Sequence, residues 1–137
     1  DTLFHPLTTD VLIEQRVAAL VGRAYRRQLW FFFVDRERRQ RPLLIPFSDP
    51  PNHPDDSVPD LARVMKHALH TQEAESLIIV LERYADAVFS AGDKAWARRL
   101  TREFAALQVP VLGFLVSHRR GVRWLTKDDY EFETVVT

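Results

Sequence analysis

The chain alternates between short continuous runs of apolar residues and longer stretches in which apolar residues recur every three or four positions. The first pattern is typical of buried strands, and the second is typical of helices that pack one face on a core. Residues 29–34 are apolar on both faces of an extended chain, which indicates a central strand covered on two sides. These patterns predict helices that begin near residues 8, 59 and 90, strands at 29–34, 42–46, 76–81 and 122–125, and a further strand that starts with residues 109–112.

The first helix has capping oxygens at residues 8–10 and an apolar repeat that continues for several turns. We expect its last turn to carry three arginines, because positive charge suits the negative end of a helix dipole. These arginines are Arg23, Arg26 and Arg27. The apolar positions of this helix are Val11, Leu12, Val17, Leu20, Val21 and Ala24.

The order of the predicted elements is α-β-β-α-β-α-β-β. It indicates an α/β protein, a three-layer α-β-α sandwich built on a mixed sheet. Prolines at positions 42 and 46 place the second strand at an edge of that sheet or keep it short. The segment 47–60 is rich in proline, aspartate and serine, so we expect a long surface loop there.

No internal repeat or linker divides the sequence. We therefore expect a single domain over residues 1–137, with a core at about 7–125 and an acidic C-terminal tail at 126–137. Within that tail, residues 132–136 form a candidate edge strand.

Composition restricts the classes of function. Nineteen basic and nineteen acidic residues cancel, and the pI is near 7.2, so no global field attracts nucleic acid or a membrane. The absence of cysteine excludes disulfides, thiol catalysis and cysteine-containing zinc sites, and it is compatible with a reducing cytoplasm. The longest apolar run, 29–34, is far too short to span a bilayer. We expect a cytoplasmic protein with no membrane partner.

Several short motifs follow one another in an order found in one protein superfamily. The polar residues 8–10 open the first helix, Val34-Asp35 closes the first strand, and Pro59 through Ala68-Leu69 forms the second helix. Ser90-x-x-Asp93 opens the third helix, and Val109-Pro110-Val111-Leu112 begins the next strand. Over roughly residues 7–125 this arrangement resembles the RadC-like branch of the JAB/MPN metalloproteins. The resemblance implies the cytidine-deaminase/JAB-like fold.

The resemblance also implies a zinc motif, His-x-His-x7-Ser-x-x-Asp, in which the two histidines and the aspartate hold the metal. Counted back from Ser90, the histidine positions hold Val80 and Glu82. Of the motif, Ser90 and Asp93 remain as vestiges. A hydrolytic zinc normally has three protein ligands and an open position.

Two further family positions also differ. The glutamate that serves the family as general base falls at about Arg27, and a later Asp-His pair corresponds to Gly113-Phe114. The resemblance therefore implies a degenerate, non-catalytic member, a pseudoenzyme with no metal and no other cofactor.

Simpler structural roles account for the remaining candidate ligands. Ser90 and Asp93 form a capping box, which a helix start requires whatever its chemistry. His53 lies in a turn-rich loop. His67 and His70 fall on the solvent face of the second helix, and we expect His118 to be exposed in the last hairpin.

Arginines are the remaining functional signal. The candidate contacts for nucleic acid or a partner are Arg36, Arg38, Arg39, Arg119, Arg120 and Arg123. Such clusters can bind phosphates or lie in protein interfaces, although acidic neighbours also fit ordinary solvated faces.

Three functions remain open. The first is a non-catalytic RadC/JAB-like module that binds a protein partner or forms a homo-oligomer. The second is a DNA- or RNA-binding accessory protein that uses the arginine clusters. The third is a metal-dependent hydrolase with an unrecognised site, assembled from Asp93, Glu82 and His53. The loss of the zinc ligands beside an intact core favours the first.

Overall fold

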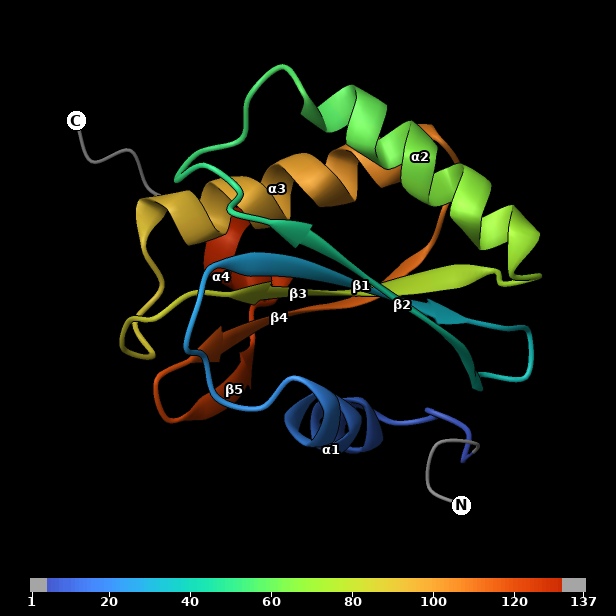
Figure 1. The fold of residues 1–137 in the computed structure, drawn as a ribbon, viewed down its shortest axis with the longest axis horizontal. Helices are drawn as coiled ribbons and strands as arrows, with labels where there is room; N and C mark the ends of the chain where they lie inside the picture. Colours follow the sequence, from blue (N-terminus) through green and yellow to red (C-terminus); the bar gives the residue numbers. More distant parts are fainter. Residues whose placement is uncertain (1–4, 132–137) are drawn as a thin grey trace.

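The computed structural model describes residues 5–131 and contains a five-stranded sheet with helices on both faces (Figure 1). β3 and β4 are parallel, and all other neighbouring strands are antiparallel. The prediction of an α/β fold with a mixed sheet is confirmed. The strands are β1 (Gln28–Val34), β2 (Gln40–Ser48), β3 (Ser76–Glu82), β4 (Val111–His118) and β5 (Gly121–Trp124), and they lie in the order β2-β1-β3-β4-β5.

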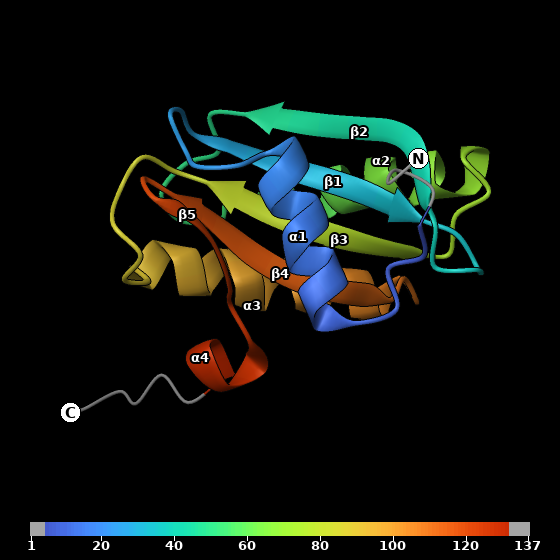
Figure 2. The same cartoon turned by 90° about the horizontal axis from the view of Figure 1, so that it is seen from below.

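The helices complete a three-layer arrangement. α2 (Val58–Thr71) and α3 (Ala91–Ala106) cover one face of the sheet, and α1 (Asp10–Leu20) crosses the other face (Figures 1 and 2). A short helix, α4 (Lys127–Glu131), follows β5 and packs beside α3, where Arg98 donates a hydrogen bond to the carbonyl of Tyr130. The sequence reading did not include α4, and its candidate strand at 132–136 lies outside the described residues.

Two apolar clusters use the alternating side chains of the central strands. In β1, Phe31 and Phe33 point toward α2 and α3, whereas Phe32 and Val34 point toward α1. β3 alternates in the same way, and all seven of its residues are buried. The continuous apolar runs of the sequence thus mark strands covered on both faces, as expected for the centre of such a sheet.

The end of α1 differs from the prediction. Thr9 caps its start as expected, with its Oγ1 accepting a hydrogen bond from the Leu12 amide. The helix ends at Leu20 because the chain turns at Gly22, whose φ of 69° favours glycine. The arginines at 23, 26 and 27 therefore lie in the connection to β1, and the prediction of a basic last helical turn is wrong.

The buried face of α1 also differs from the predicted repeat. Ile13 and Val17 are buried, whereas Val11 and Leu20 are exposed. Arg16, on the same side of the helix as Ile13 and Val17, is also buried. Its guanidinium donates to Gln40 Oε1 on β2 at 2.8 Å and to the backbone carbonyl of His5 at 3.3 Å.

β2 lies at an edge of the sheet, as its prolines predict. It is longer than the sequence indicates, and the connection from it to α2 is correspondingly short, from residue 49 to residue 57. Within the described residues, no helix combines the length and the apolar character needed to cross a membrane.

Candidate functional site at the carboxyl ends of β3 and β4

Three connections meet where the parallel strands β3 and β4 end, on the left of Figure 1. They are residues 21–27, residues 83–90 and the hairpin at 118–121. Backbone hydrogen bonds join them: Ala24 N to His118 O at 2.7 Å, and Arg119 N to Ala85 O at 2.9 Å. In open α/β sheets, ligands are bound beyond the carboxyl ends of strands, so this end of the molecule is the candidate site.

A buried ion pair lies at the centre of this end. The Arg83 guanidinium contacts both carboxylate oxygens of Asp93, with Nε at 3.1 Å from each and Nη2 at 2.9 Å from Oδ2. The two side chains are 7% and 3% exposed. Asp93 Oδ2 also accepts the Ser90 amide, which completes the predicted capping box at the start of α3.

Arg83 also holds the connection in which it lies. Its Nη1 donates to the carbonyl of Asp86 at 2.7 Å, and its Nη2 donates to the carbonyl of Val88 at 3.0 Å. The Arg83 guanidinium therefore links two carbonyls of the β3–α3 connection to Asp93 in the first turn of α3. Removing one partner of such a buried ion pair strongly lowers the free energy of unfolding, because the other charge stays buried without a partner.

The β2–α2 connection covers the same helix start. Arg27 donates to the carbonyls of Pro50 and Pro51, and Trp96 Nε1 donates to the Pro51 carbonyl at 2.8 Å. Asn52 lies so close to Gly92 that a Cβ there would be 2.3 Å from the Asn52 carbonyl oxygen, so glycine is required. Burial lowers the pKa of Arg27, and the nearby Asp93 carboxylate opposes this shift.

The positions counted as lost zinc ligands do not face Asp93. Val80 lies in the apolar cluster under α1, on the opposite face of the sheet from α3. Glu82 lies on that same face, where its carboxylate accepts hydrogen bonds from the amides of Tyr25 and Arg26 and from Trp30 Nε1 at 3.0 Å. Glu82 is 1% exposed and fastens the α1–β1 connection to β3.

The residues present do not fit a zinc ion. Asp93 already binds a guanidinium, Val80 is apolar, and Glu82 and Asp93 lie on opposite faces of the sheet. The residue beside Asp93 at the end of β3 is Arg83, a cation that repels metal. Within residues 5–131 no group of three histidine, cysteine, aspartate or glutamate side chains is arranged to hold a metal ion.

The other family positions are also occupied by structural contacts. Gly113 lies directly beneath the indole ring of Trp124, and Phe114 is buried in the cluster under α2 and α3. Neither position supplies a ligand.

The structure also locates the histidines considered from the sequence. His67 and His70 are exposed on α2, as expected, and His53 is exposed in the β2–α2 connection. His118 is 9% exposed, so the prediction that it is exposed is wrong. It ends β4, and its Nδ1 accepts a hydrogen bond from the Arg120 amide. Burial lowers the pKa of His118, and Arg83, Arg123 and Arg120 lower it further.

Exposed tyrosines, arginines and a valine lie on the connections that meet at this end and on the adjoining strand β5. We call this surface the strand-end face, formed by Tyr25, Arg26, Tyr84, Val88, Arg119, Arg120 and Arg123. Arg26 lies over the Tyr25 ring at 5.1 Å, Arg119 over Tyr84 at 6.0 Å, and Arg123 over Phe89 at 4.0 Å. Tyr25, Tyr84 and Val88 are among the most exposed large apolar side chains of the described residues.

The arginines proposed from the sequence are divided between two ends of the sheet. Arg119, Arg120 and Arg123 belong to the strand-end face, whereas Arg36, Arg38 and Arg39 lie in the β1–β2 hairpin at the opposite end. There Arg36 pairs with Glu75, and Arg38 donates to the carbonyl of Leu7. The structure therefore does not unite the six residues into one surface.

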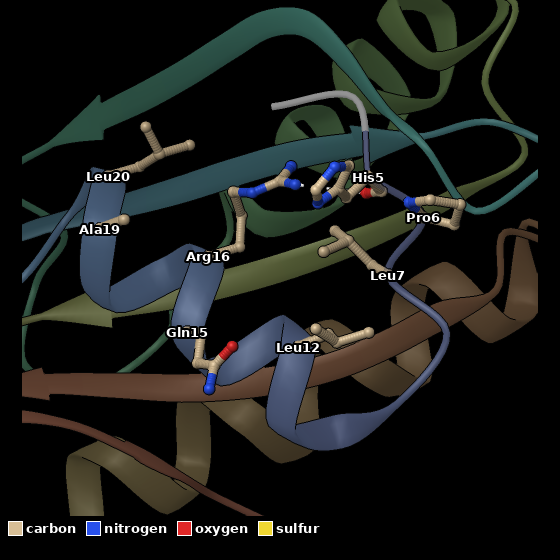
Figure 3. A pocket seen from close by; sticks show the side chains of 8 residues that line it. All are labelled: His5, Pro6, Leu7, Leu12, Gln15, Arg16, Ala19 and Leu20. Atoms are coloured by element: carbon tan, nitrogen blue, oxygen red, sulfur yellow. Dashed lines mark hydrogen bonds between the residues drawn. The ribbon is translucent and has the colours of Figure 1, made fainter. Parts of the chain in front are cut away.

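A cavity of about 340 Å³ lies elsewhere, between α1 and the segment that precedes it (Figure 3). Its lining is mainly apolar, from Leu7, Leu12, Ala19 and Leu20. In Figure 3 Arg16 points toward His5, whose backbone carbonyl accepts its hydrogen bond. Arg16 thus holds the N-terminal segment in place beside this cavity.

Sequence reasoning did not identify Arg83, Tyr25, Tyr84 or Val88 as site residues. A usable signal was present for the tyrosines, since Tyr25-Arg26 and Arg83-Tyr84 each place a ring beside an arginine in a connection between elements. No protein-family model matches the sequence, and no curated protein matches it. The geometry of this end of the molecule is therefore the basis for assigning a function.

Proposed function

We propose that this chain is a non-catalytic domain of the RadC/JAB-like type that binds a protein partner through the strand-end face. The observation that carries this proposal is the exposure of Tyr25, Tyr84 and Val88 beside arginines stacked on rings. Tyrosine and arginine are enriched in protein interfaces and among the residues that dominate binding energy.

The absence of catalysis is supported by what surrounds Asp93. A carboxylate that serves as a metal ligand or a general base must be accessible to its substrate. Asp93 is instead buried, and its oxygens accept hydrogen bonds from Arg83 and Ser90. These contacts support a structural role for the residues that resemble the family motif.

A nucleic-acid partner is the second candidate. It is favoured by the same stacked arginines, because grooves for single strands combine aromatic rings with basic side chains. In this candidate the arginines contact phosphates, and binding weakens steeply as salt rises.

The test uses a photo-crosslinking amino acid placed at Val88, with Val64 as the matched control. Both valines are highly exposed, at 72% and 59%, but Val64 lies on the outer side of α2. We expect a discrete protein adduct from position 88 and none from position 64, because the partner covers the strand-end face. An adduct of twice the chain mass identifies a second copy as the partner.

The opposite results would overturn the proposal. Equal adducts from both positions would show that the strand-end face is not selective, and adducts to nucleic acid alone would establish the second candidate. Stoichiometric zinc in the purified protein, measured by elemental analysis, would contradict the non-catalytic part of the proposal.

A further inference from the structure

The strand-end face carries a local excess of positive charge on a chain whose net charge is zero. The segments 21–27, 83–90 and 118–123, which supply this face, contain its four arginines and one further exposed arginine, Arg23. Asp86 is the one acidic side chain exposed in those segments. Glu82 and Asp93 are buried there and already hydrogen-bonded. A partner that matches this face must present negative charge.

Arg123 and Arg26 are held in place before any partner arrives. Arg123 lies 4.0 Å from the Phe89 ring centre and also donates to the carbonyl of Ala87. The Arg26 guanidinium contacts two rings, at 5.1 Å from the centre of Tyr25 and 5.8 Å from the centre of Trp30. A guanidinium stacked on a ring keeps its N–H groups free at its edge, where a carboxylate can bind two of them. Such preorganisation lowers the entropy lost on binding.

The same face offers apolar contacts between the charges. Tyr25, Tyr84 and Val88 are 70%, 68% and 72% exposed. A partner that carried only charge would leave these groups unused, whereas a protein segment with aliphatic or aromatic side chains would bury them.

We infer that the strand-end face binds an acidic protein segment in which aspartate or glutamate side chains flank apolar ones. This inference rests on the proposed function and adds the chemistry of the partner. The carboxylates pair with Arg119, Arg120 and Arg26, and the apolar side chains pack against Tyr84 and Val88.

Single-stranded nucleic acid fits this face less well. A guanidinium already covers one face of the Tyr25 ring and one face of the Tyr84 ring, so fewer ring faces remain for bases. Val88 offers nothing on which a base stacks. The chain as a whole has no excess of positive charge, which nucleic-acid-binding proteins usually have.

The experiment measures fluorescence anisotropy of labelled ligands at low and moderate salt. The first ligand is a short peptide in which Asp and Glu alternate with Leu and Trp. The second is the same peptide with Asn and Gln in place of the acids, and the third is oligothymidylate. We expect the acidic peptide to bind at least about tenfold more tightly than the other two, since charge-assisted pairs supply much of the affinity.

Two double variants of the protein test whether the acidic peptide binds at the strand-end face. Arg119→Gln with Arg120→Gln should weaken binding of the acidic peptide at least about tenfold. Arg36→Gln with Arg39→Gln removes the same charge from exposed positions at the opposite end of the sheet and should leave the affinity unchanged.

The possible failures are distinguishable. Equal binding of the acidic and amide peptides, or no peptide binding while position 88 still crosslinks to a protein, would overturn this inference and leave the proposed function standing. Tighter binding of oligothymidylate, lost with Arg119→Gln and Arg120→Gln, would overturn both. Equal weakening by the Arg36 and Arg39 variant would also overturn the inference, because it would show a nonspecific charge effect.

Discussion

Arg83 is the residue whose loss should most disturb this end of the molecule. Its removal leaves the Asp93 carboxylate buried without a counter-charge and releases the carbonyls of Asp86 and Val88. We expect Arg83→Ala to lower the free energy of unfolding by about 3–5 kcal/mol, measured by urea denaturation. The matched control is Arg36→Ala, which breaks the exposed pair with Glu75 and should cost about 0–1 kcal/mol.

A double-mutant cycle separates the ion pair from the other contacts of Arg83. Arg83→Ala and Asp93→Ala remove groups that contact each other, so their combined effect should be smaller than the sum of the single effects. Additive effects would show that the two side chains stabilise the protein independently, contrary to the structure.

We expect His118 to make the free energy of unfolding depend on pH. Burial, followed by Arg83, Arg123 and Arg120, lowers its pKa, so the folded state favours the neutral imidazole. The unfolded chain then binds the proton more readily. The resulting stability is fully present above the ordinary histidine pKa of about 6.5 and is lost as pH falls toward the lowered folded value.

Substitution of His118 should therefore flatten the pH profile below about pH 6.5. His118→Asn keeps a hydrogen-bond acceptor for the Arg120 amide but cannot titrate. In urea unfolding between neutral and mildly acidic pH, we expect His118→Asn to lose less stability than the wild type. His70→Asn, which alters an exposed histidine on α2, should keep the wild-type profile. An unchanged slope in His118→Asn would rule out this histidine as the cause.

At the scale of elements, the two central strands were predictable, whereas the start of the next strand at residue 109 was not, because β4 begins at Val111. The runs at 29–34 and 76–81 differ from β1 and β3 by one residue at one end, because a strand buried on both faces must be apolar throughout. The prolines of β2 correctly indicated an edge. The end of α1 was misplaced because Gly22 stops the helix before the apolar repeat ends.

The candidate site could not be predicted in full from the hydrophobic pattern of the sequence, because tertiary contacts form it. The sequence identified Ser90 and Asp93 as a capping box, and the structure confirms it. The sequence did not show that Arg83 pairs with the Asp93 carboxylate. That contact depends on how residues 84–89 fold between the two side chains. His118 was wrongly expected to be exposed, because the α1–β1 connection, in which the Ala24 amide donates to the His118 carbonyl, lies beside it only in the tertiary fold.

At the scale of the whole molecule, the central strands couple the two layers. β1 and β3 send alternate side chains into both apolar clusters, so neither layer can separate without disturbing the sheet that serves the other. We expect Ile13→Ala, in the α1 layer, to lower the free energy of unfolding by about 2–5 kcal/mol. Leu100→Ala, in the α3 layer, should have an effect of the same order, because both side chains are fully buried.

The tryptophans allow each layer to be followed separately during urea unfolding. Trp30 packs against the α1 cluster, and Trp96 is buried in the cluster under α2 and α3. In variants in which Trp124 is replaced and either Trp30 or Trp96 is the remaining tryptophan, Ile13→Ala should shift the midpoint of both fluorescence transitions equally, since a cooperative domain unfolds as one unit. Val11→Ala, on the exposed side of α1, should change the free energy of unfolding obtained from either transition by no more than about 0.5 kcal/mol. A shift of the Trp30 transition alone would show that α1 detaches first, and the layers would then be independent.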